Sequence, residues 1–464
     1  MQDHTTHSHT SAQDDATQSH TSTPNDATHS HTSTGDHTIS LEYARQKDQQ
    51  DTLQSFRSRF HFPKHNGRDV IYFCGNSLGL QPQQTAACFQ QELKDWQDLA
   101  IGGYWQARTP WMTYPQSMRP TLSRIVGCLE EEVTVMNALT VNLHLLLLTF
   151  YRPGAPRTND HPAPGGPARY KILIEAGAFP SDQYAVETQI KWHGLDPADA
   201  LIELSPREGE KTIREEDILQ TIHQHKDTLA LVLLGGINYY TGQLFDMAAI
   251  TAAAHKAGAL AGFDLAHAVG NAPLRLHDWD VDFAVWCSYK YLNGGPGAAG
   301  GAFIHQRFAT NKDLIRLGGW WGNDEASRFR MEKGFVPKPT AEGWSMSTAQ
   351  VFNMVALKAS LAIFEEAGIE TLQAKSRELT SYLSALLKTL DNLSFDILTP
   401  AEPHRRAAQL SLYFGAQGKA IHQRMIDAGV VVDYREPGVV RVAPTPLYNS
   451  FEDVYHFCNI LRQL

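Results

Sequence analysis

Short apolar runs alternate with amphipathic stretches through the middle of the chain. Strand-like apolar runs occupy residues 133–136, 170–175, 230–234, 260–264 and 283–287. Between them, residues 215–225 and 248–257 carry apolar positions at helical spacing. Strands separated by helices are typical of right-handed βαβ units, because parallel strands need a crossover connection. The pattern therefore predicts an α/β fold with a mostly parallel central sheet that helices cover on both faces.

The last quarter of the chain follows a different pattern. Long helical stretches at 350–367 and 372–390 precede short strand-like runs at 409–414 and 430–432, which predicts a smaller α+β domain. Helices are also expected at 86–100, 121–132 and 141–150. We expect four parts: a tail at 1–36, an N-terminal segment at 37–75 that packs with the small domain, a large α/β domain at 76–349 and the small domain at 350–464.

Two segments lack the apolar residues that a core needs. In the tail, Ser-His-Thr-Ser recurs at 8–11, 19–22 and 30–33, with no aliphatic or aromatic bulk between the repeats. Such a segment cannot offset its ordering entropy by burial, so we expect it to be disordered. Its dispersed histidines would make a weak, unselective metal site, and we predict no metal centre. Residues 152–168 concentrate Pro and Gly and indicate an exposed loop.

Composition excludes several classes of protein. With 42% hydrophobic and 19% charged residues, the chain has the composition of a globular protein. Its formal charge of −10, without a basic cluster, argues against a nucleic-acid partner. No apolar run approaches the roughly 18 residues of a membrane span, and no secretory signal is recognisable. Five scattered cysteines without C-x-x-C spacing suit a reducing compartment, so we expect a cytoplasmic enzyme.

One lysine and one aspartate carry the candidate chemistry. Lys290 lies in Cys287-Ser-Tyr-Lys-Tyr-Leu-Asn293, and Asp264 lies 26 positions earlier at the end of an apolar run. An amine that can form a Schiff base and a carboxylate that can hold a pyridinium proton are what pyridoxal phosphate (PLP) requires of a protein. The alternatives are a surface lysine after a strand and an aspartate that caps a helix.

Further residues support a PLP pocket at the carboxyl ends of the strands, where open α/β sheets bind ligands. Leu139 and Thr140 open a predicted helix and can bind a phosphate. Phe179, with Asp182 nearby, can stack on the ring. Tyr240 and Tyr289 offer further hydroxyl groups. His267 either contacts the ring or is an ordinary core histidine.

A glycine motif in the same region indicates a different cofactor at first sight. Residues 295–300 match G-x-G-x-x-G, the dinucleotide fingerprint. That fingerprint requires a helix after it, whereas residues 301–305 are strand-like. We therefore do not expect a dinucleotide site.

With these residues in order, the chain closely resembles the kynureninase family of fold-type-I PLP enzymes, in the class V aminotransferase-like group. The resemblance covers about residues 41–464. Its motifs are Tyr72-Phe-Cys-Gly-Asn-Ser-Leu-Gly-Leu80, Asn137-Ala-Leu-Thr-Val-Asn-Leu143, Phe179-Pro-Ser-Asp182, Tyr240-Thr-Gly-Gln243, Phe263-Asp-Leu-Ala-His-Ala-Val-Gly-Asn271, His277-Asp-Trp279, Cys287-Ser-Tyr-Lys-Tyr-Leu-Asn293 and Arg441-Val-Ala-Pro-Thr-Pro-Leu-Tyr-Asn449.

The resemblance implies hydrolysis of L-kynurenine, or its 3-hydroxy form, to anthranilate or 3-hydroxyanthranilate and L-alanine. It implies a homodimer with shared active sites, in which the partner subunit supplies the tryptophan that matches Trp320. Catalytic roles fall to Lys290, Tyr289 and Asp264. The implied cofactor-binding residues are Leu139, Thr140, Phe179, Pro180, Ser181, Asp182, Gly235, Asp264, His267, Tyr289, Lys290, Trp320 and Thr348. The implied substrate-binding residues are Ser77, Tyr104, Thr348 and Arg441.

The chain departs from the family pattern around the substrate ring. Relatives that prefer 3-hydroxykynurenine carry Ser, Asn and His where this chain has Gly235, Thr348 and Tyr104. The loss of polar partners for a ring hydroxyl favours unsubstituted kynurenine. Other interpretations are a cysteine desulfurase or small-amino-acid aminotransferase, and a binding protein that kept only the fold. A desulfurase needs a cysteine in a mobile late loop, which the sequence lacks, and the presence of both Lys290 and Asp264 argues against a binding protein.

Overall fold

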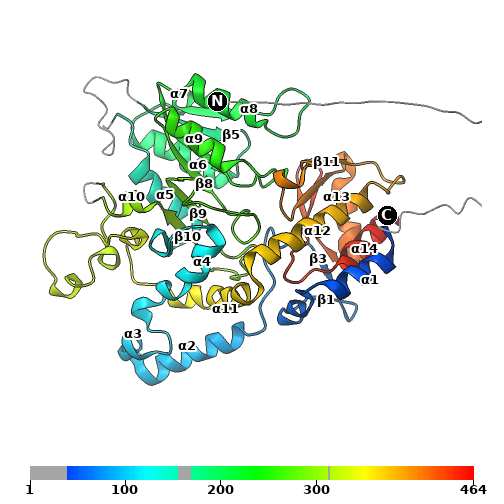
Figure 1. Ribbon diagram of the computed structural model, residues 1–464, viewed down its shortest axis with the longest axis horizontal. Helices are drawn as coiled ribbons and strands as arrows, with labels where there is room; N and C mark the ends of the chain where they lie inside the picture. The colour runs from blue at the N-terminus through cyan, green and yellow to red at the C-terminus, as the bar shows by residue number, and fades with distance from the viewer. Residues whose placement is uncertain (1–38, 155–168, 312–313) are drawn as a thin grey trace, which may run out of the picture. The chain divides into compact units, whose positions relative to one another are not determined.

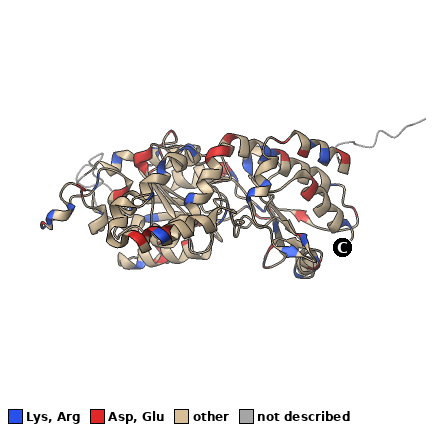
Figure 2. Cartoon of the chain, turned by 90° about the horizontal axis from the view of Figure 1, so that it is seen from below, with Lys and Arg blue, Asp and Glu red and all other residues tan. Residues whose placement is uncertain are grey.

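The computed structural model describes residues 39–154, 169–311 and 314–464, all within the compact unit Thr38–Leu464. The predictions for the tail at 1–36 and for residues 155–168 of the Pro- and Gly-rich loop lie outside the described residues. Within the described part, no helix is both long and apolar enough to cross a membrane. Lys and Arg are interspersed with Asp and Glu along the helices (Figure 2).

A seven-stranded sheet forms the centre of the fold. Its order is β4-β10-β9-β8-β7-β5-β6, and β10 alone runs antiparallel to its neighbours. The mostly parallel sheet predicted from the sequence is therefore confirmed. The strands are β4 (Val133–Val135), β5 (Lys171–Glu175), β6 (Leu201–Leu204), β7 (Leu229–Gly235), β8 (Leu260–Asp264), β9 (Phe283–Trp286) and β10 (Gly301–Ile304). The connection between β9 and β10 contains no helix, so the chain returns antiparallel.

Successive side chains of the sheet enter two separate apolar cores. In β7, Val232 and Leu234 join one core, while Leu231 and Leu233 join the other. This alternation follows from the two-residue period of a strand, and it explains why the central strands are apolar at nearly every position. Figure 1 shows helices α5, α6 and α9 beside the strands.

The helices of the large sheet region are α2 (Thr85–Leu99), α3 (Gly103–Gln106), α4 (Arg119–Val126), α5 (Leu139–Phe150), α6 (Pro180–Trp192), α7 (Pro197–Ala200), α8 (Glu215–Gln224), α9 (Met247–Lys256) and α10 (Gln306–Ala309). Of the five that were predicted, α2, α5, α8 and α9 begin and end within two residues of the predicted positions, and α4 is the exception. The helix predicted over 121–132 is wrong beyond Val126. Gly127 has φ +65°, and a Cβ there would lie 2.3 Å from the carbonyl oxygen of Leu274, so the helix ends and residues 130–132 form a 3-10 turn.

A second, four-stranded sheet lies in the C-terminal part, in the order β11-β12-β15-β14. Its strands are β11 (Asp396–Ile397), β12 (Leu410–Tyr413), β14 (Asp433–Arg435) and β15 (Val439–Val442). Its core includes residues from α1 (Leu41–Gln50), α12 (Ile369–Leu387), α13 (Gly418–Asp427) and α14 (Phe451–Arg462). The hairpin of β1 (Lys64–His65) and β2 (Arg68–Asp69) stands apart from this sheet.

The N-terminal segment contacts this C-terminal part. Strand β3 (Ile71–Tyr72) pairs in parallel with β13 (Val430–Val431), and Ala44 and Phe73 lie in the C-terminal core. Helix α11 (Val351–Ala367) instead packs in the core of the large sheet through Leu357 and Leu361, and α12 leads from there to the second sheet (Figure 1). The domain boundaries given above stay predictions.

The parallel strands bring five separate segments to one edge of the large sheet. Strands β4, β5, β7, β8 and β9 run in the same direction, so the residues that follow them meet at their carboxyl ends. Open α/β sheets bind ligands at this edge.

Candidate active site

A pocket opens at the carboxyl ends of these strands. Its lining combines one amine, three carboxyl groups, a histidine, three aromatic rings and the start of a helix. The lining residues are Leu139, Thr140, Glu175, Phe179, Ser181, Asp182, Gly235, Ile237, Tyr239, Asp264, Ala266, His267, Cys287, Tyr289 and Lys290. Ten residues predicted to bind the cofactor are therefore together, and Pro180 lies beside them as the first residue of α6.

Lys290 is partly buried just beyond β9. Its Nζ lies 3.0 Å from Nε2 of His267 and 5.8 Å from the centroid of the Phe179 ring. Burial and the positive charge of Lys290 hold the pKa of His267 well below its usual value. A neutral His267 accepts a hydrogen bond from the lysine amine, so the imidazole orients Lys290 within the pocket.

Asp264 and Asp182 form a pair of buried carboxyl groups. Asp264 ends β8, and its Oδ1 accepts the backbone N–H of Ala266 at 2.7 Å. Burial raises the pKa of both groups, and the charge of Asp264 raises that of Asp182 further. Two carboxylates this close cannot both be charged in a low-dielectric site without a cationic partner. Oδ1 of Asp182 is buried without a partner among the described residues.

Glu175 is a third pocket carboxyl group, and it was not among the residues predicted from the sequence. It ends β5, is 3% exposed, and accepts hydrogen bonds from the Gly235 backbone N–H and the Asn238 side chain, each at 3.0 Å. Burial raises its pKa to about 7. The signal was the same as for Asp264, a carboxylate at the end of an apolar strand. The hydroxyl side chain beside the pocket also differs from the expectation, since Tyr239, not Tyr240, lines it.

The start of α5 faces the pocket with backbone N–H groups. Ala138 is the N-cap and offers no side-chain acceptor, so the N–H groups of the first turn, at Leu139 and Thr140, have no partner within the helix and can bind an anion. Gly300 allows β10 to approach this turn, because a Cβ there would lie 3.2 Å from the Leu139 nitrogen and 2.7 Å from the Trp286 carbonyl oxygen.

Arg441 and Ser77 lie together next to the pocket. The guanidinium of Arg441 is 1% exposed and donates to the Ser77 hydroxyl at 3.0 Å and to the carbonyl oxygen of Tyr239, a lining residue, at 2.8 Å. It also pairs with Asp433, which the sequence analysis did not single out.

Besides Pro180, Ser77 and Arg441, which lie next to the lining, three further predicted residues are not part of the pocket of this chain. Tyr104 packs edge-on against Trp111 with ring centroids 5.6 Å apart. Trp320 is 41% exposed and donates its indole N–H to the Arg328 carbonyl oxygen, and Thr348 is exposed. Within one described chain these side chains are separate from the lysine and its carboxylates.

The lining fits PLP. Helix-start N–H groups suit its phosphate, the unpartnered oxygen of Asp182 and the carboxylate of Asp264 suit a pyridinium N–H, and Lys290 supplies the amine. Nδ1 of His267 is also buried without a partner among the described residues, so it too can bind a polar ligand atom.

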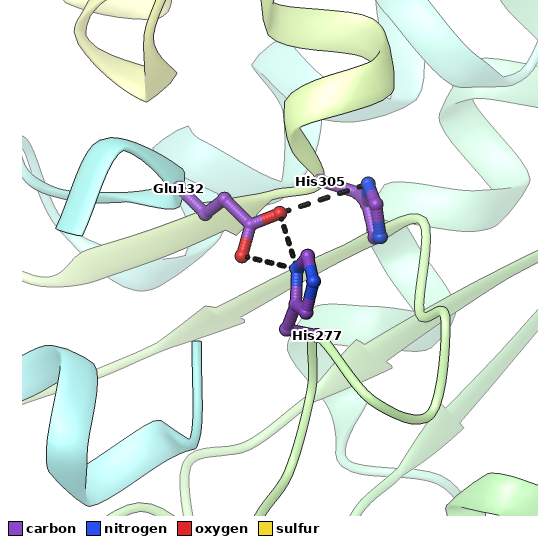
Figure 3. A group of neighbouring side chains, drawn as sticks. All are labelled: Glu132, His277 and His305. Carbon is purple, nitrogen blue, oxygen red and sulfur yellow. Dashed lines mark hydrogen bonds and ion pairs between the residues drawn. The ribbon is translucent and has the colours of Figure 1, made fainter. Parts of the chain in front are cut away.

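A second cluster of ionisable residues has a different role. Glu132, His277 and His305 converge near the amino ends of the parallel strands, and their ligand atoms lie within 4.8 Å of one another (Figure 3). Both carboxylate oxygens of Glu132 are engaged, by the backbone N–H groups of Leu129 and Gln306 and by Nδ1 of His277. The two imidazole rings stack at 16°. Because Glu132 precedes β4 and His305 follows β10, these contacts connect the two strands, and the cluster has a structural role.

Comparisons with solved structures identify the fold. A structure of a C-DES mutant, with glycine covalently linked to its PLP cofactor, superposes on this chain with a TM-score of 0.70 at 16% sequence identity. The alignment covers 85% of this chain and 97% of the C-DES chain. Fold and pocket together define a PLP-dependent enzyme of fold type I.

Sequence relatives are much closer. The family pattern described as "Kynureninase C-terminal domain" matches residues 372–461. Kynureninase of Myxococcus xanthus is 50% identical over 91% of this chain and 97% of its own length. That of Koribacter versatilis is 49% identical over 89% and 95%. The chain belongs to the kynureninase family, whose members hydrolyse carbon–carbon bonds, and this membership decides against a desulfurase.

Proposed function

We propose that the pocket holds PLP on Lys290 and hydrolyses the Cβ–Cγ bond of L-kynurenine, or its 3-hydroxy form. The products are anthranilate, or 3-hydroxyanthranilate, and L-alanine. The observation that carries this proposal is the convergence of Lys290, Asp264 and Asp182 in one pocket of a chain that is half identical to kynureninases.

Different residues of the pocket bind different parts of the cofactor. When bound, PLP supplies a ring that accepts electrons from the substrate. Asp264, with Asp182 beside it, holds the pyridinium proton, and the N–H groups of Leu139 and Thr140 hold the phosphate. Phe179, Pro180, Ser181, Gly235 and His267 complete the cofactor-binding surface.

Proton transfers fall to two neighbouring side chains. The amine of Lys290 takes and returns the proton at the substrate Cα, and His267 keeps that amine in place. Burial raises the pKa of the Tyr289 hydroxyl well above its usual value, so the hydroxyl stays protonated at neutral pH. It is therefore suited to give a proton to the carbon that the departing fragment leaves behind.

The substrate carboxylate binds Arg441, with Ser77 beside it. A buried guanidinium favours a carboxylate because both groups are planar and charged. Thr348 and Tyr104 stand where relatives that prefer 3-hydroxykynurenine carry Asn and His, so the chain lacks two polar partners for a ring hydroxyl. We therefore propose a preference for unsubstituted kynurenine.

We further propose a cytoplasmic homodimer with shared active sites. Several large apolar side chains are exposed on the single chain, among them Trp96 at 58%, Ile101 at 71%, Trp105 at 56% and Trp320 at 41%. Exposed apolar groups of this size are common at protein interfaces. A second subunit would bring Trp320 to the neighbouring pocket. All five cysteines are free, which suits a reducing compartment.

The fluorescence of anthranilate released from L-kynurenine, with and without added PLP, tests this function. We expect PLP-dependent release and a higher kcat/KM for kynurenine than for 3-hydroxykynurenine. No anthranilate from the PLP-loaded protein would contradict the activity, and a strong preference for the hydroxylated substrate would contradict only the specificity.

A further inference from the structure

The guanidinium of Arg441 is largely engaged by the chain itself. An arginine has five N–H donors. The Nε–H donates to Oδ1 of Asp433 at 3.0 Å, and Nη2 forms an ion pair with the same oxygen at 2.8 Å. An Nη2–H donates to the Ser77 hydroxyl at 3.0 Å. One Nη1–H binds the Tyr239 carbonyl oxygen. One N–H, on Nη1, is left without a partner among the described residues.

The backbone fixes the pair of Arg441 and Asp433. The two residues face each other directly across the antiparallel strands β14 and β15. Side chains opposite each other in such a ladder are the closest cross-strand neighbours, so the register brings the carboxylate to the guanidinium. The carboxylate is held in turn, because Oδ2 accepts the Ser77 hydroxyl at 2.6 Å and Arg435 donates to both oxygens.

The side chains of Arg441, Arg435 and Asp433 together carry a net positive charge that one bound anion can neutralise. Burial alone would raise the pKa of Asp433, but the charge of Arg441, the Ser77 hydroxyl and Arg435 together lower it, so the carboxylate is ionised at neutral pH. Two guanidinium groups and one carboxylate give a net charge of +1. That charge matches the single carboxylate of an α-amino acid.

We propose that Asp433 is a positioning residue that holds the Nε/Nη2 edge of Arg441, so that the substrate carboxylate binds the opposite edge, formed by Nη1 and Nη2. This inference rests on the proposed function, in which Arg441 is the carboxylate anchor. The substrate displaces the Ser77 hydroxyl from Nη2 and takes the free N–H on Nη1, while Asp433 stays in place. Because the guanidinium is already oriented, binding need not order a long flexible side chain.

Asp433→Asn in the PLP-loaded enzyme tests this role, because the amide keeps the shape but loses the charge. Two ligands are compared: L-kynurenine, and kynuramine, the same molecule without the carboxylate, used as a competitive inhibitor. We expect KM for kynurenine to rise by about tenfold to a hundredfold, as for the loss of one member of a buried charge pair. We expect kcat within about threefold and the inhibition constant of kynuramine within about twofold of wild type, because neither depends on the anchor.

The matched control is Asp396→Asn, an exposed aspartate on strand β11 of the same sheet. This substitution should change neither the KM for kynurenine nor the inhibition constant of kynuramine. If Asp433→Asn does not fold with PLP bound, Asp433→Glu decides, since it keeps the charge and moves the guanidinium. A raised KM for kynurenine with unchanged kynuramine binding then supports the role.

Three results would overturn the inference. They are an unchanged KM, an equal loss of affinity for both ligands, and tighter kynurenine binding, which would make Asp433 a competitor of the substrate. Failure of the proposed function is distinguishable. Wild type would release no anthranilate, or Arg441→Gln would keep its preference for kynurenine over kynuramine.

Discussion

At the scale of single residues, the order of the strands accounts for the pocket. Lys290 and Asp264 follow neighbouring parallel strands, β9 and β8, and so meet at one edge of the sheet. Both could be predicted, because each residue follows a recognisable apolar run. The closeness of Asp182 to Asp264, and the contact of His267 with Lys290, could not be predicted. They depend on how helices and loops pack after the strands, and no local pattern records that packing.

Asp264→Asn should disable the enzyme without unfolding it. The amide oxygen can still accept the Ala266 N–H, but the charged partner proposed for the pyridinium is lost, and only the neighbouring Asp182 remains. Loss of a buried charge partner costs about 3–5 kcal/mol, which lowers kcat by about 150-fold to 5,000-fold if the loss falls on the transition state. Steady-state kinetics with saturating PLP measure it, beside the exposed control Asp227→Asn. A variant within threefold of wild type would contradict the role of Asp264.

At the scale of elements, the opposite edge of the sheet is held by ionisable groups. Glu132, just before β4, binds the start of α10 and His277, and Asp282, just before β9, accepts the Ala261 backbone N–H and contacts His255 on α9. The strands themselves were predictable from apolar runs. The antiparallel direction of β10 and the early end of α4 were not predicted, because they depend on the long turn before β10 and on the close contact of Gly127 with Leu274.

Glu132→Gln should destabilise the fold and leave the pocket residues intact. Glutamine keeps one acceptor oxygen and places an amide N–H against backbone donors, so we expect the free energy of unfolding to fall by about 3 kcal/mol. Chemical unfolding of the PLP-loaded protein measures the change. Its neighbour Glu131 is exposed, and Glu131→Gln should stay within about 0.5 kcal/mol of wild type. Equal free energies of unfolding for the two variants would show that the cluster in Figure 3 does not stabilise the fold.

The contact between His255 and Asp282 should make stability depend on pH. The hydrogen bond to Asp282 outweighs burial and raises the pKa of His255. A raised folded-state pKa means that the stabilisation is fully present below the unfolded-state value of about 6.5 and is lost as pH rises through the folded-state pKa. The stability difference between wild type and His255→Gln should therefore shrink from about pH 6 to about pH 9. The exposed His223→Gln, on α8, should show no such trend, and a difference for His255 that is independent of pH would exclude the linkage.

At the scale of the whole molecule, distant parts of the sequence complete one another. Strand β3 pairs with β13 more than 350 positions later, and Ser77, close after β3, contacts Arg441 of β15. Family resemblance indicated Ser77 and Arg441 as substrate residues, but hydrophobic periodicity could not reveal their contact. Pairing across such a separation leaves no local signal. Three other predicted site residues do not line the pocket of a single chain, namely Tyr104, Trp320 and Thr348.

Mixing two inactive variants tests whether active sites are shared between subunits. We expect Lys290→Ala and Trp320→Ala each to abolish most activity. After unfolding, mixing in equal amounts and refolding with PLP, about a quarter of wild-type activity should return, because half of the random dimers hold one site with both residues intact. A mixture no more active than its components would mean that Trp320 serves the pocket of its own chain or none.

Every role proposed for the pocket depends on Lys290 as the residue that carries the cofactor. Borohydride reduction of the PLP-loaded protein, followed by proteolysis and peptide mass spectrometry, locates the bound pyridoxyl group directly. The account predicts the added mass on the peptide that contains Lys290, and none on that peptide in Lys290→Ala. Labelling of a different lysine in the wild-type protein would contradict it.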